Sequence, residues 1–228
     1  GDAVTQIDCT FADGAGPEAM GEALARIRAE AEDAVRSGAG HLVLSDEKLG
    51  PDRIGLPMIL ATSAVHSWLT RKGLRTFCSL NVRSAECMDP HYFAVLIGCG
   101  ATTVNPYLAQ DTIAERIERG LLSGSLIDNM RNYRDAIDAG LLKIMAKMGI
   151  SVLSSYRGGL NFEAVGLSRA MVAEYFPGMQ SRISGIGLHG LQAKLEDVHH
   201  KGFHAPVTEL LPVGGFYKLR RSGEKHAW

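Results

Sequence analysis

The 228-residue chain lacks any long apolar run and carries little net charge of either sign. No stretch approaches the roughly 18 apolar residues that a membrane-spanning helix needs. The first residues, Gly1 to Gln6, lack the basic and then apolar pattern of a signal peptide. The formal net charge is −1, so no global positive field would attract nucleic acid. We therefore expect a cytoplasmic protein that binds neither membranes nor nucleic acid.

Cysteine is scarce and scattered. The four cysteines, Cys9, Cys78, Cys87 and Cys99, match no zinc or iron–sulfur ligand spacing. Cys87 and His91 could form half of a metal site, but no second half accompanies them. Because free cysteine packs as a small apolar residue, we expect buried thiols and no metal site.

Familiar catalytic signatures are also missing. No Gly-x-Ser-x-Gly nucleophile turn occurs, and no lysine falls on an expected strand, which removes the residue a Schiff-base mechanism needs. The segment from Gly185 to Gly190 formally matches the Gly-x-Gly-x-x-Gly phosphate-binding pattern. It would follow the last expected strand, with no further unit after it. We favour a tight turn that glycine permits, and a nucleotide-binding loop is the alternative.

What the chain does contain is a repeated unit of one helix followed by one strand. Amphipathic spacing, with proline or Asp-Pro at the start and glycine at the end, identifies the helices, and short apolar runs identify the strands. The expected helices cover 17–36, 57–72, 89–98, 112–119, 126–139, 140–147, 162–176 and 191–200, with a break near Gly166 that Ser168 can recap. The expected strands cover 41–44, 76–80, 101–104, 150–153 and 181–184.

Five consecutive alternations imply parallel pairing, because each crossover contains a helix. A complete (β/α)₈ barrel needs eight strands in about 250 residues. We therefore expect an α/β fold in which parallel strands alternate with helices in a partial TIM-barrel-like arrangement. The expected division is an α/β domain over 1–203 and an extended linker over 204–228, leading toward a following domain.

Polar side chains follow the expected strands, where α/β proteins usually bind ligands. If these strand ends share one face, their carboxylates, guanidinium groups and amides could orient a small anionic substrate. We favour the alternative that they hydrogen-bond one another and the loop backbones. The set comprises Asp46, Glu47, Asn81, Arg83, Glu86, Asn105, Ser154, Ser155, Tyr156 and Arg157.

Several short segments of this chain match segments of a known protein family, and they occur in the same order. They include Leu44-Ser45-Asp46, Pro57-Met-Ile-Leu-Ala61, His91-Tyr-Phe-Ala94, Asn105-Pro-Tyr-Leu-Ala109, Gly140-Leu-Leu-Lys143, Lys147-Met-Gly-Ile-Ser151 and Phe162-Glu-Ala164. From about residue 20 to residue 190 the chain closely resembles the central domain of the large subunit of bacterial glutamate synthase. The segments over 211–217 and 220–227 resemble the connector into the flavin domain of that enzyme.

The resemblance implies a multidomain enzyme that releases ammonia from glutamine and passes it through an internal tunnel. Reduced FMN and an iron–sulfur cluster then serve to convert 2-oxoglutarate and ammonia into glutamate. The family's amidotransferase nucleophile is an amino-terminal cysteine, whereas this chain starts with Gly1, so we do not expect the glutaminase in it. We expect no catalytic, cofactor-binding or metal-ligating residue in this segment, and FMN and the iron–sulfur cluster elsewhere in the parent enzyme.

The expected role is a scaffold that couples the glutaminase and FMN synthase sites and helps to wall the ammonia passage. Its partners would be the amidotransferase and FMN domains of the same enzyme, with an electron-donating subunit as a further candidate. The candidate residues for the interdomain or passage-lining surface are Asn105, Ser154, Ser155, Tyr156 and Arg157.

Two alternatives stay open at this stage. One is a self-contained barrel that binds a small anionic or phosphate ligand through Arg83, Arg157 and the turn at Gly185. The other is a separately encoded interaction subunit.

Overall fold

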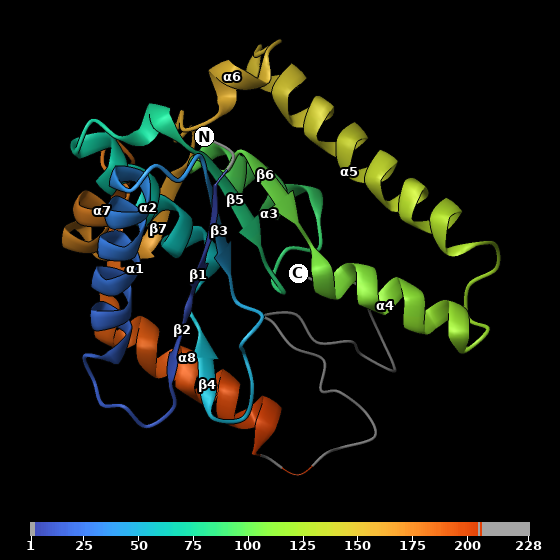
Figure 1. Ribbon diagram of the computed structural model, residues 1–228, viewed down its shortest axis with the longest axis horizontal. Coiled ribbons are helices and arrows are strands. Elements are labelled where there is room, and N and C mark those ends of the chain that lie inside the picture. The colour runs from blue at the N-terminus through green and yellow to red at the C-terminus, as the bar shows by residue number, and fades with distance from the viewer. Residues whose placement is uncertain (1–2, 205, 207–228) are drawn as a thin grey trace, which may run out of the picture.

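A computed structural model describes residues 3–204 and residue 206 (Figure 1). Its centre is a four-stranded parallel sheet in the order β1-β3-β5-β6. The strands are β1 (Val4–Asp8), β3 (His41–Ser45), β5 (Ser79–Arg83) and β6 (Thr103–Asn105). The connecting helices are α1 (Ala19–Arg36), α2 (Met58–Arg71) and α3 (Pro90–Gly98), with a 3₁₀ turn, η1 (Arg75–Phe77), before β5. The predicted α/β class, with parallel strands alternating with helices, is confirmed.

The remaining elements surround this sheet. An antiparallel ribbon of β2 (Thr10–Ala12) and β4 (Arg53–Gly55) extends its carboxyl end, and β7 (Glu163–Leu167) pairs in parallel with β8 (Gln180–Ile186). The other helices are α4 (Tyr107–Glu118), α5 (Leu126–Met148), α6 (Leu153–Tyr156), α7 (Arg169–Tyr175) and α8 (Leu188–Phe203). Within the described residues the three sheets stay separate, so a barrel is not confirmed.

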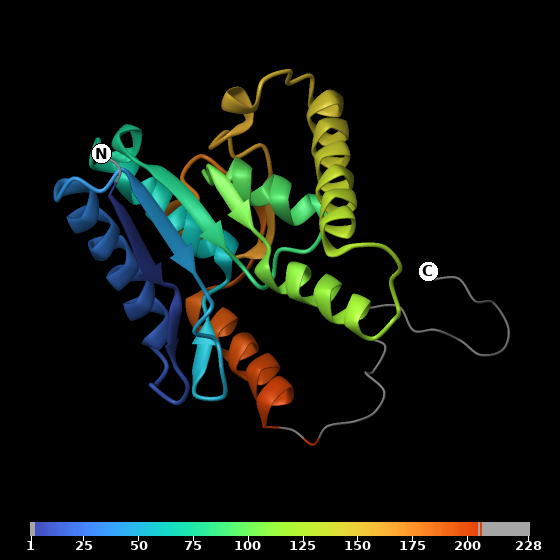
Figure 2. The ribbon, with the colours of Figure 1, turned by 45° about the vertical axis from the view of Figure 1, so that its right-hand side comes forward.

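The four-stranded sheet has two different faces. On one face Ile7, Leu42, Leu44, Leu80 and Val82 are at most 1% exposed and join the core with α1 and α2. We call this the covered face. The opposite face, which we call the open face, carries the alternate residues of each strand. Figure 2 shows α2 behind the sheet and no described helix across its near face.

The open face is polar and partly exposed. One register row across it holds Gln6, Val43, Asn81 and Thr103, all half-buried or exposed. The hydroxyl of Thr103 donates to Asn81 Oδ1 at 2.7 Å, so neighbouring strands are also linked by side chains on this face. Parallel sheets are usually covered on both faces, which makes this one-sided arrangement unusual.

Local sequence signals explain the best-predicted helix ends. Asp89 caps α3 by accepting hydrogen bonds from the backbone N–H groups of His91 and Tyr92 at 2.8 and 3.2 Å. Ser168 caps α7 in the same way through Met171 N, as its expected recapping role predicts. At the carboxyl end of α5, Gly149 takes a positive φ of 72°, which glycine adopts without strain.

The strand expected over 150–153 is wrong. Helix α5 runs to Met148, and α6 begins at Leu153 after a short loop. The apolar run serves a helix contact instead: Ile150 packs against a small cluster that contains Ala94, Met145 and Tyr156. Tertiary packing on helices α3 and α5 therefore accounts for the hydrophobicity that suggested a buried strand.

Residues 163–167 form a strand where the helical spacing predicts the start of a helix. The backbone of β7 approaches β8 so closely that a Cβ atom at Gly185 would lie 2.1 Å from the carbonyl oxygen of Gly166. Strand pairing at this glycine contact replaces the expected helix, which begins only after Ser168. The strand expected over 76–80 is shifted to β5, and the short strands β1, β2 and β4 were not expected.

The expected division at residue 203 stays a prediction, because only residues 204 and 206 of the expected linker are described. Among the helices of the described ranges, none is both long and apolar enough to cross a membrane.

Candidate functional site

The carboxyl ends of the four parallel strands meet at one edge of the sheet. Their register places Asp8, Ser45, Arg83 and Asn105 in one row. In α/β proteins this edge is the usual position for ligands. The contacts of these residues decide whether they are available for one.

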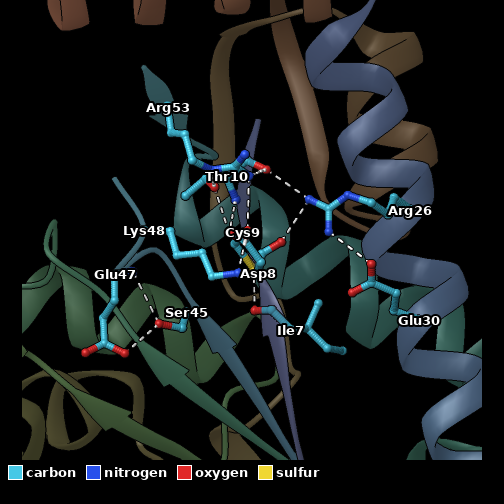
Figure 3. Close-up of polar contacts among 10 residues, drawn as sticks. All are labelled: Ile7, Asp8, Cys9, Thr10, Arg26, Glu30, Ser45, Glu47, Lys48 and Arg53. Atoms are coloured by element: carbon cyan, nitrogen blue, oxygen red, sulfur yellow. Dashed lines mark hydrogen bonds and ion pairs between the residues drawn. The ribbon is translucent and has the colours of Figure 1, made fainter. Parts of the chain in front are cut away.

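Asp8 is the centre of a closed polar network (Figure 3). Its carboxylate accepts hydrogen bonds from the backbone N–H and hydroxyl of Thr10, at 3.0 and 2.7 Å, and from Arg53 at 3.0 Å. Lys48 Nζ lies 3.4 Å away. Burial disfavours the charged form of Asp8, but the Thr10 hydrogen bond and the two cations outweigh it and lower its pKa. Arg26 then ties the same turn to α1 by donating to the carbonyls of Asp8 and Thr10, each at 2.9 Å.

A second ion pair joins β3 and β5. Arg83 contacts Glu47 at 2.6 Å, and the hydroxyl of Ser45 donates to the other oxygen of Glu47 at 3.1 Å. The guanidinium group also lies over the ring of Tyr107, 5.8 Å from its centroid. Arg83 is therefore held between a carboxylate and an aromatic ring.

Asp46 and Glu86 are carboxylates that hold loops in place. Asp46 is 2% exposed, and its oxygens accept from the backbone N–H of Ala85 at 3.0 and 3.2 Å. Burial raises the pKa of Asp46, with the nearby Glu86 acting in the same direction. Glu86 accepts from Met58 N at 2.9 Å and from the Tyr92 hydroxyl. It thereby supplies a cap for α2, whose preceding residue Pro57 supplies none.

The structure thus brings together half of the predicted strand-end set. Asn105 is at this edge, where its side chain donates to Gln110 at 3.2 Å and its carbonyl accepts from Ser84 N at 3.1 Å. Asn81 lies one row farther back, on the open face, and donates to the carbonyl of Leu42 at 3.1 Å. The five residues at the edge are Asp46, Glu47, Arg83, Glu86 and Asn105.

The prediction that residues 154–157 form a strand end at this edge is wrong. They belong to α6 and the residue after it, at the opposite, amino edge of the sheet (Figure 1). Gly158 N and Leu160 N donate to the carbonyls of Ile97 and Gly98, at the end of α3 and before β6 begins. Arg83 and Arg157 therefore lie at opposite ends of the sheet and do not frame one anion site.

The four residues at the amino edge have different environments. Tyr156 is 1% exposed and packs edge-on against Phe162, with ring centroids 6.3 Å apart. Arg157 is half-buried near Arg75, while Ser154 and Ser155 are exposed. Tyr156 thus contributes to packing within this chain, and the two serines are the surface residues of the set.

Two of the three glycines of the Gly185–Gly190 segment, Gly185 and Gly190, are required by packing. Gly185 lies against the backbone of Gly166, and a Cβ atom at Gly190 would lie 2.9 Å from Cβ of Ile186. Gly187 immediately precedes α8. These contacts support the interpretation of this segment as a tight strand-to-helix turn.

The comparison with known proteins decides the family. The sequence model of the glutamate synthase central domain matches residues 1–168. The chain belongs to the glutamate synthase central domain family. It is 62% identical to the NADPH glutamate synthase large chain of Azospirillum brasilense, over 100% of this chain and 15% of that protein. It is 40% identical to the NADPH large chain of Bacillus subtilis, over 87% of this chain and 13% of that protein.

Relatives with other electron donors in their names match as well. The chain is 35% identical to the NADH glutamate synthase of Saccharomyces cerevisiae, over 98% of this chain and 11% of that protein. It is 40% identical to a ferredoxin-dependent glutamate synthase of Arabidopsis thaliana, over 86% of this chain and 13% of that protein. The resemblance noted in the sequence is confirmed, and this chain spans only 11–15% of the relatives named here.

An apolar groove is a second surface feature of this central-domain chain. It has a volume of about 760 Å³ between α3 and the hairpin of α4 and α5. Phe93, Ile97, Ile137 and Leu141 line it. Ile127, at the start of α5, is 71% exposed at its rim. Exposed apolar surface of this kind is typical of contact with another polypeptide segment.

Sequence reasoning missed several residues that organise the carboxyl edge. Asp8, Lys48 and Arg53 form the best-connected cluster, but β1 and the β2–β4 ribbon were not expected. The available signal for β1 was Ile7 between the polar residues Gln6 and Asp8, after the β-branched Val4 and Thr5. Tyr92 and Tyr107 lie on helices, and nothing in their spacing indicates a contact with the strand ends.

Proposed function

We propose that this chain is the structural central part of a glutamate synthase large chain, an enzyme that forms two glutamates from glutamine and 2-oxoglutarate. The segment spaces and couples the glutaminase and FMN synthase sites and helps to wall the ammonia passage between them. The observation that carries the proposal is the 62% identity to one such large chain over the whole of this chain. Since the match covers 15% of that protein, the partners are the amidotransferase and FMN domains of the same polypeptide.

The open face of the sheet supports this role. An all-parallel sheet is rarely left with one face toward solvent. The remaining 85% of the relative's length provides polypeptide that can cover it. We infer that another part of the large chain packs on the open face, and that the passage runs along this contact.

The chemistry of the open face suits a neutral polar molecule. This face carries imidazole, hydroxyl and amide groups that are bonded to one another: His41 Nδ1 and Ser79 Oγ lie 2.7 Å apart at the amino ends of β3 and β5, and Asn81 accepts from Thr103 at 2.7 Å in the next row. Ammonia that reached bulk water would be protonated, so a wall that excludes water has catalytic value without supplying a reacting group. Asn105, the last residue of β6, lies on the same face, and we propose that it lines the passage. We propose that Ser154 and Ser155 form part of the interdomain surface at the amino edge.

Cofactor chemistry belongs to other parts of the proposed enzyme. The chain matches relatives named for NADPH, NADH and ferredoxin, so a common central part serves all three donors. We propose that FMN, the iron–sulfur cluster and any electron-donating subunit bind outside this segment. The isolated chain should bind neither FMN nor 2-oxoglutarate in isothermal titration. A cytoplasmic location stays part of the same proposal.

The proposal is tested by introducing a charge on the open face of the intact large chain. Thr103→Arg should leave glutaminase activity and ammonia-dependent glutamate synthesis in place, while glutamine-dependent synthesis falls by about tenfold or more, because ammonia no longer passes between the sites. Ser37→Arg, in the exposed turn after α1, is the matched control and should change none of the three rates. Unchanged coupling in Thr103→Arg would contradict the assignment of the open face.

The amino edge is tested separately with Ser155→Arg. If this exposed serine lies at an interdomain surface, the substitution should weaken coupling while the isolated chain keeps its stability. Coupling equal to that of Ser37→Arg would remove Ser154 and Ser155 from the proposed surface. Tyr156→Ala is unsuitable for this purpose, because the ring is part of the chain's own core.

A further inference from the structure

The end of α8 brings a carboxylate and two imidazoles together against the β2–β4 ribbon. Asp13 follows β2, His199 lies one turn before the end of α8, and His204 follows the helix. One ligand atom from each residue lies within 4.8 Å of the other two. Figure 1 shows α8 crossing the ribbon at this end of the molecule. None of these residues belongs to the predicted strand-end set.

The buried histidine has the tautomer of a metal ligand. His199 Nε2 lies 2.8 Å from the carbonyl oxygen of Gly50, and because a carbonyl only accepts, Nε2 carries the hydrogen. In the neutral ring Nδ1 then presents a lone pair. This atom is buried and has no hydrogen-bond partner among the described residues, although its side chain is only 3% exposed. A ligating histidine usually donates its other N–H to such a carbonyl.

The free lone pair points toward a carboxylate. His199 Nδ1 and Asp13 Oδ2 are 3.8 Å apart, too far for a hydrogen bond, and two acceptors that face each other need a cation between them. His204 Nε2 is also 3.8 Å from Asp13 Oδ2. In a tetrahedral site with bonds of about 2.0–2.1 Å, ligand atoms lie about 3.3 Å apart. Each imidazole must therefore move about half an ångström closer to the carboxylate, and the two imidazoles, whose ligand atoms lie within 4.8 Å of each other, move together as the ion binds.

We propose that Asp13, His199 and His204 bind a divalent transition-metal ion, with Zn²⁺ as the best match to two imidazoles and one carboxylate. His204 now donates to the carbonyl of Pro51 at 3.1 Å and exchanges this hydrogen bond for the metal when the ion binds. Its side chain is 37% exposed, which leaves it room to turn. Water completes the coordination.

The surroundings favour a cation at this point. Asp13 makes no ion pair with lysine or arginine within the described ranges, so no side-chain cation there competes for its charge. The ring of Phe203 packs beside the buried imidazole, with its centroid 4.8 Å from that of His199. A bound ion would fix the end of α8 to the loops around β2 and β4, and thereby fix where the chain leaves the helix. This inference is independent of the proposed function and replaces the expectation that the segment has no metal-ligating residue.

The test is titration of the untagged, metal-free 228-residue chain with Zn²⁺, followed by calorimetry. We expect one ion per chain, with an increase of about 5 °C or more in the melting temperature when free Zn²⁺ is far above the dissociation constant. Asp13→Asn and His204→Gln should each weaken binding by about tenfold or more. Both residues are partly exposed, so circular dichroism should show an intact fold.

The matched control is His189→Gln. His189 lies near the other end of α8 and faces a carboxylate, Glu18 at 3.5 Å, but no third ligand joins them among the residues that the structure describes. Its substitution should leave Zn²⁺ binding unchanged. Titration with Co²⁺ should give the weak d–d bands of a nitrogen and oxygen site without a thiolate charge-transfer band, since all four cysteines are buried and free.

Three results would overturn the proposal. They are the absence of saturable binding, equal binding by Asp13→Asn and His189→Gln, and a thiolate band with Co²⁺. The first would mean that the buried nitrogen is satisfied by a proton alone.

Discussion

The two faces of the parallel sheet differ in burial and in polarity. Leu42, Leu44 and Leu80 on the covered face are fully buried beneath α1 and α2, whereas Gln6 and Thr103 on the open face are exposed. Both faces come from the same strands, because side chains alternate along each strand. The covered face therefore stabilises the chain by itself, while the open face is available for the contact proposed above.

The largest expected effect is a difference between neighbouring residues of β3. Leu44→Ala should lower the free energy of unfolding by about 2–5 kcal/mol, because it removes buried methyl groups and leaves a cavity. Val43→Ala, on the open face, should cost less than about 1 kcal/mol in the isolated chain. Urea unfolding of both variants measures the difference. Equal losses would mean that the open face is packed within this chain.

A smaller effect is expected at a buried glutamine behind the covered face. Gln192 is 3% exposed; it accepts from Met20 N at 3.0 Å and donates to the carbonyl of Gly16 at 2.7 Å. It thereby caps α1 from α8, so Gln192→Ala should cost about 1–3 kcal/mol by leaving these groups unpaired. Gln6→Ala, the control on the open face, should stay within about 0.5 kcal/mol in thermal unfolding. A neutral Gln192→Ala would contradict the capping role.

The smallest expected effect is the pH dependence of stability contributed by two carboxylates at the carboxyl edge, Asp8 and Asp46, which should have opposite signs. The pKa of Asp8 is lowered, so its contribution is present at neutral pH and is lost as the pH falls below about 3.9 and through the folded value. Asp8→Asn should therefore cost about 1 kcal/mol at pH 7, and this cost should shrink as the pH falls through the lowered folded value. The measurement is urea unfolding across this pH range.

Asp46 should behave in the opposite way. Its pKa is raised by burial, so the folded state binds more protons than the unfolded state between about pH 3.9 and the raised value. Stability contributed by Asp46 falls as the pH rises through this window. Asp46→Asn keeps an acceptor for Ala85 N and should become more favourable, relative to the natural chain, as the pH rises. A change in the opposite direction would show that the Ala85 hydrogen bonds outweigh burial.

The helices that form the covered side were predictable from local signals. The apolar spacing of α1 and α2, the Asp89-Pro90 start of α3 and the Gly149 stop of α5 each act within a few residues. Parallel pairing then placed Asp46, Glu86 and Asn105 at a common edge. These parts of the fold required no knowledge of long-range contacts.

The failures arose where distant segments decide the structure. Ile150 looks like part of a buried strand but packs against Tyr156 and Met145, and β7 forms because Gly166 meets Gly185. The Asp8 network needs Lys48 and Arg53, which lie more than 35 residues along the chain. The metal-site candidates at Asp13 and His199 are separated by most of the sequence, and only folding brings them together.

The central claim is that the open face is covered by another part of the large chain, and thiol labelling tests it most directly. Cysteines introduced at Gln6 and Thr103 should react rapidly in the isolated chain, in which the natural cysteines are buried. In the intact large chain the same two positions should be protected by about tenfold or more. Equal labelling rates in the isolated chain and the intact enzyme would contradict the account.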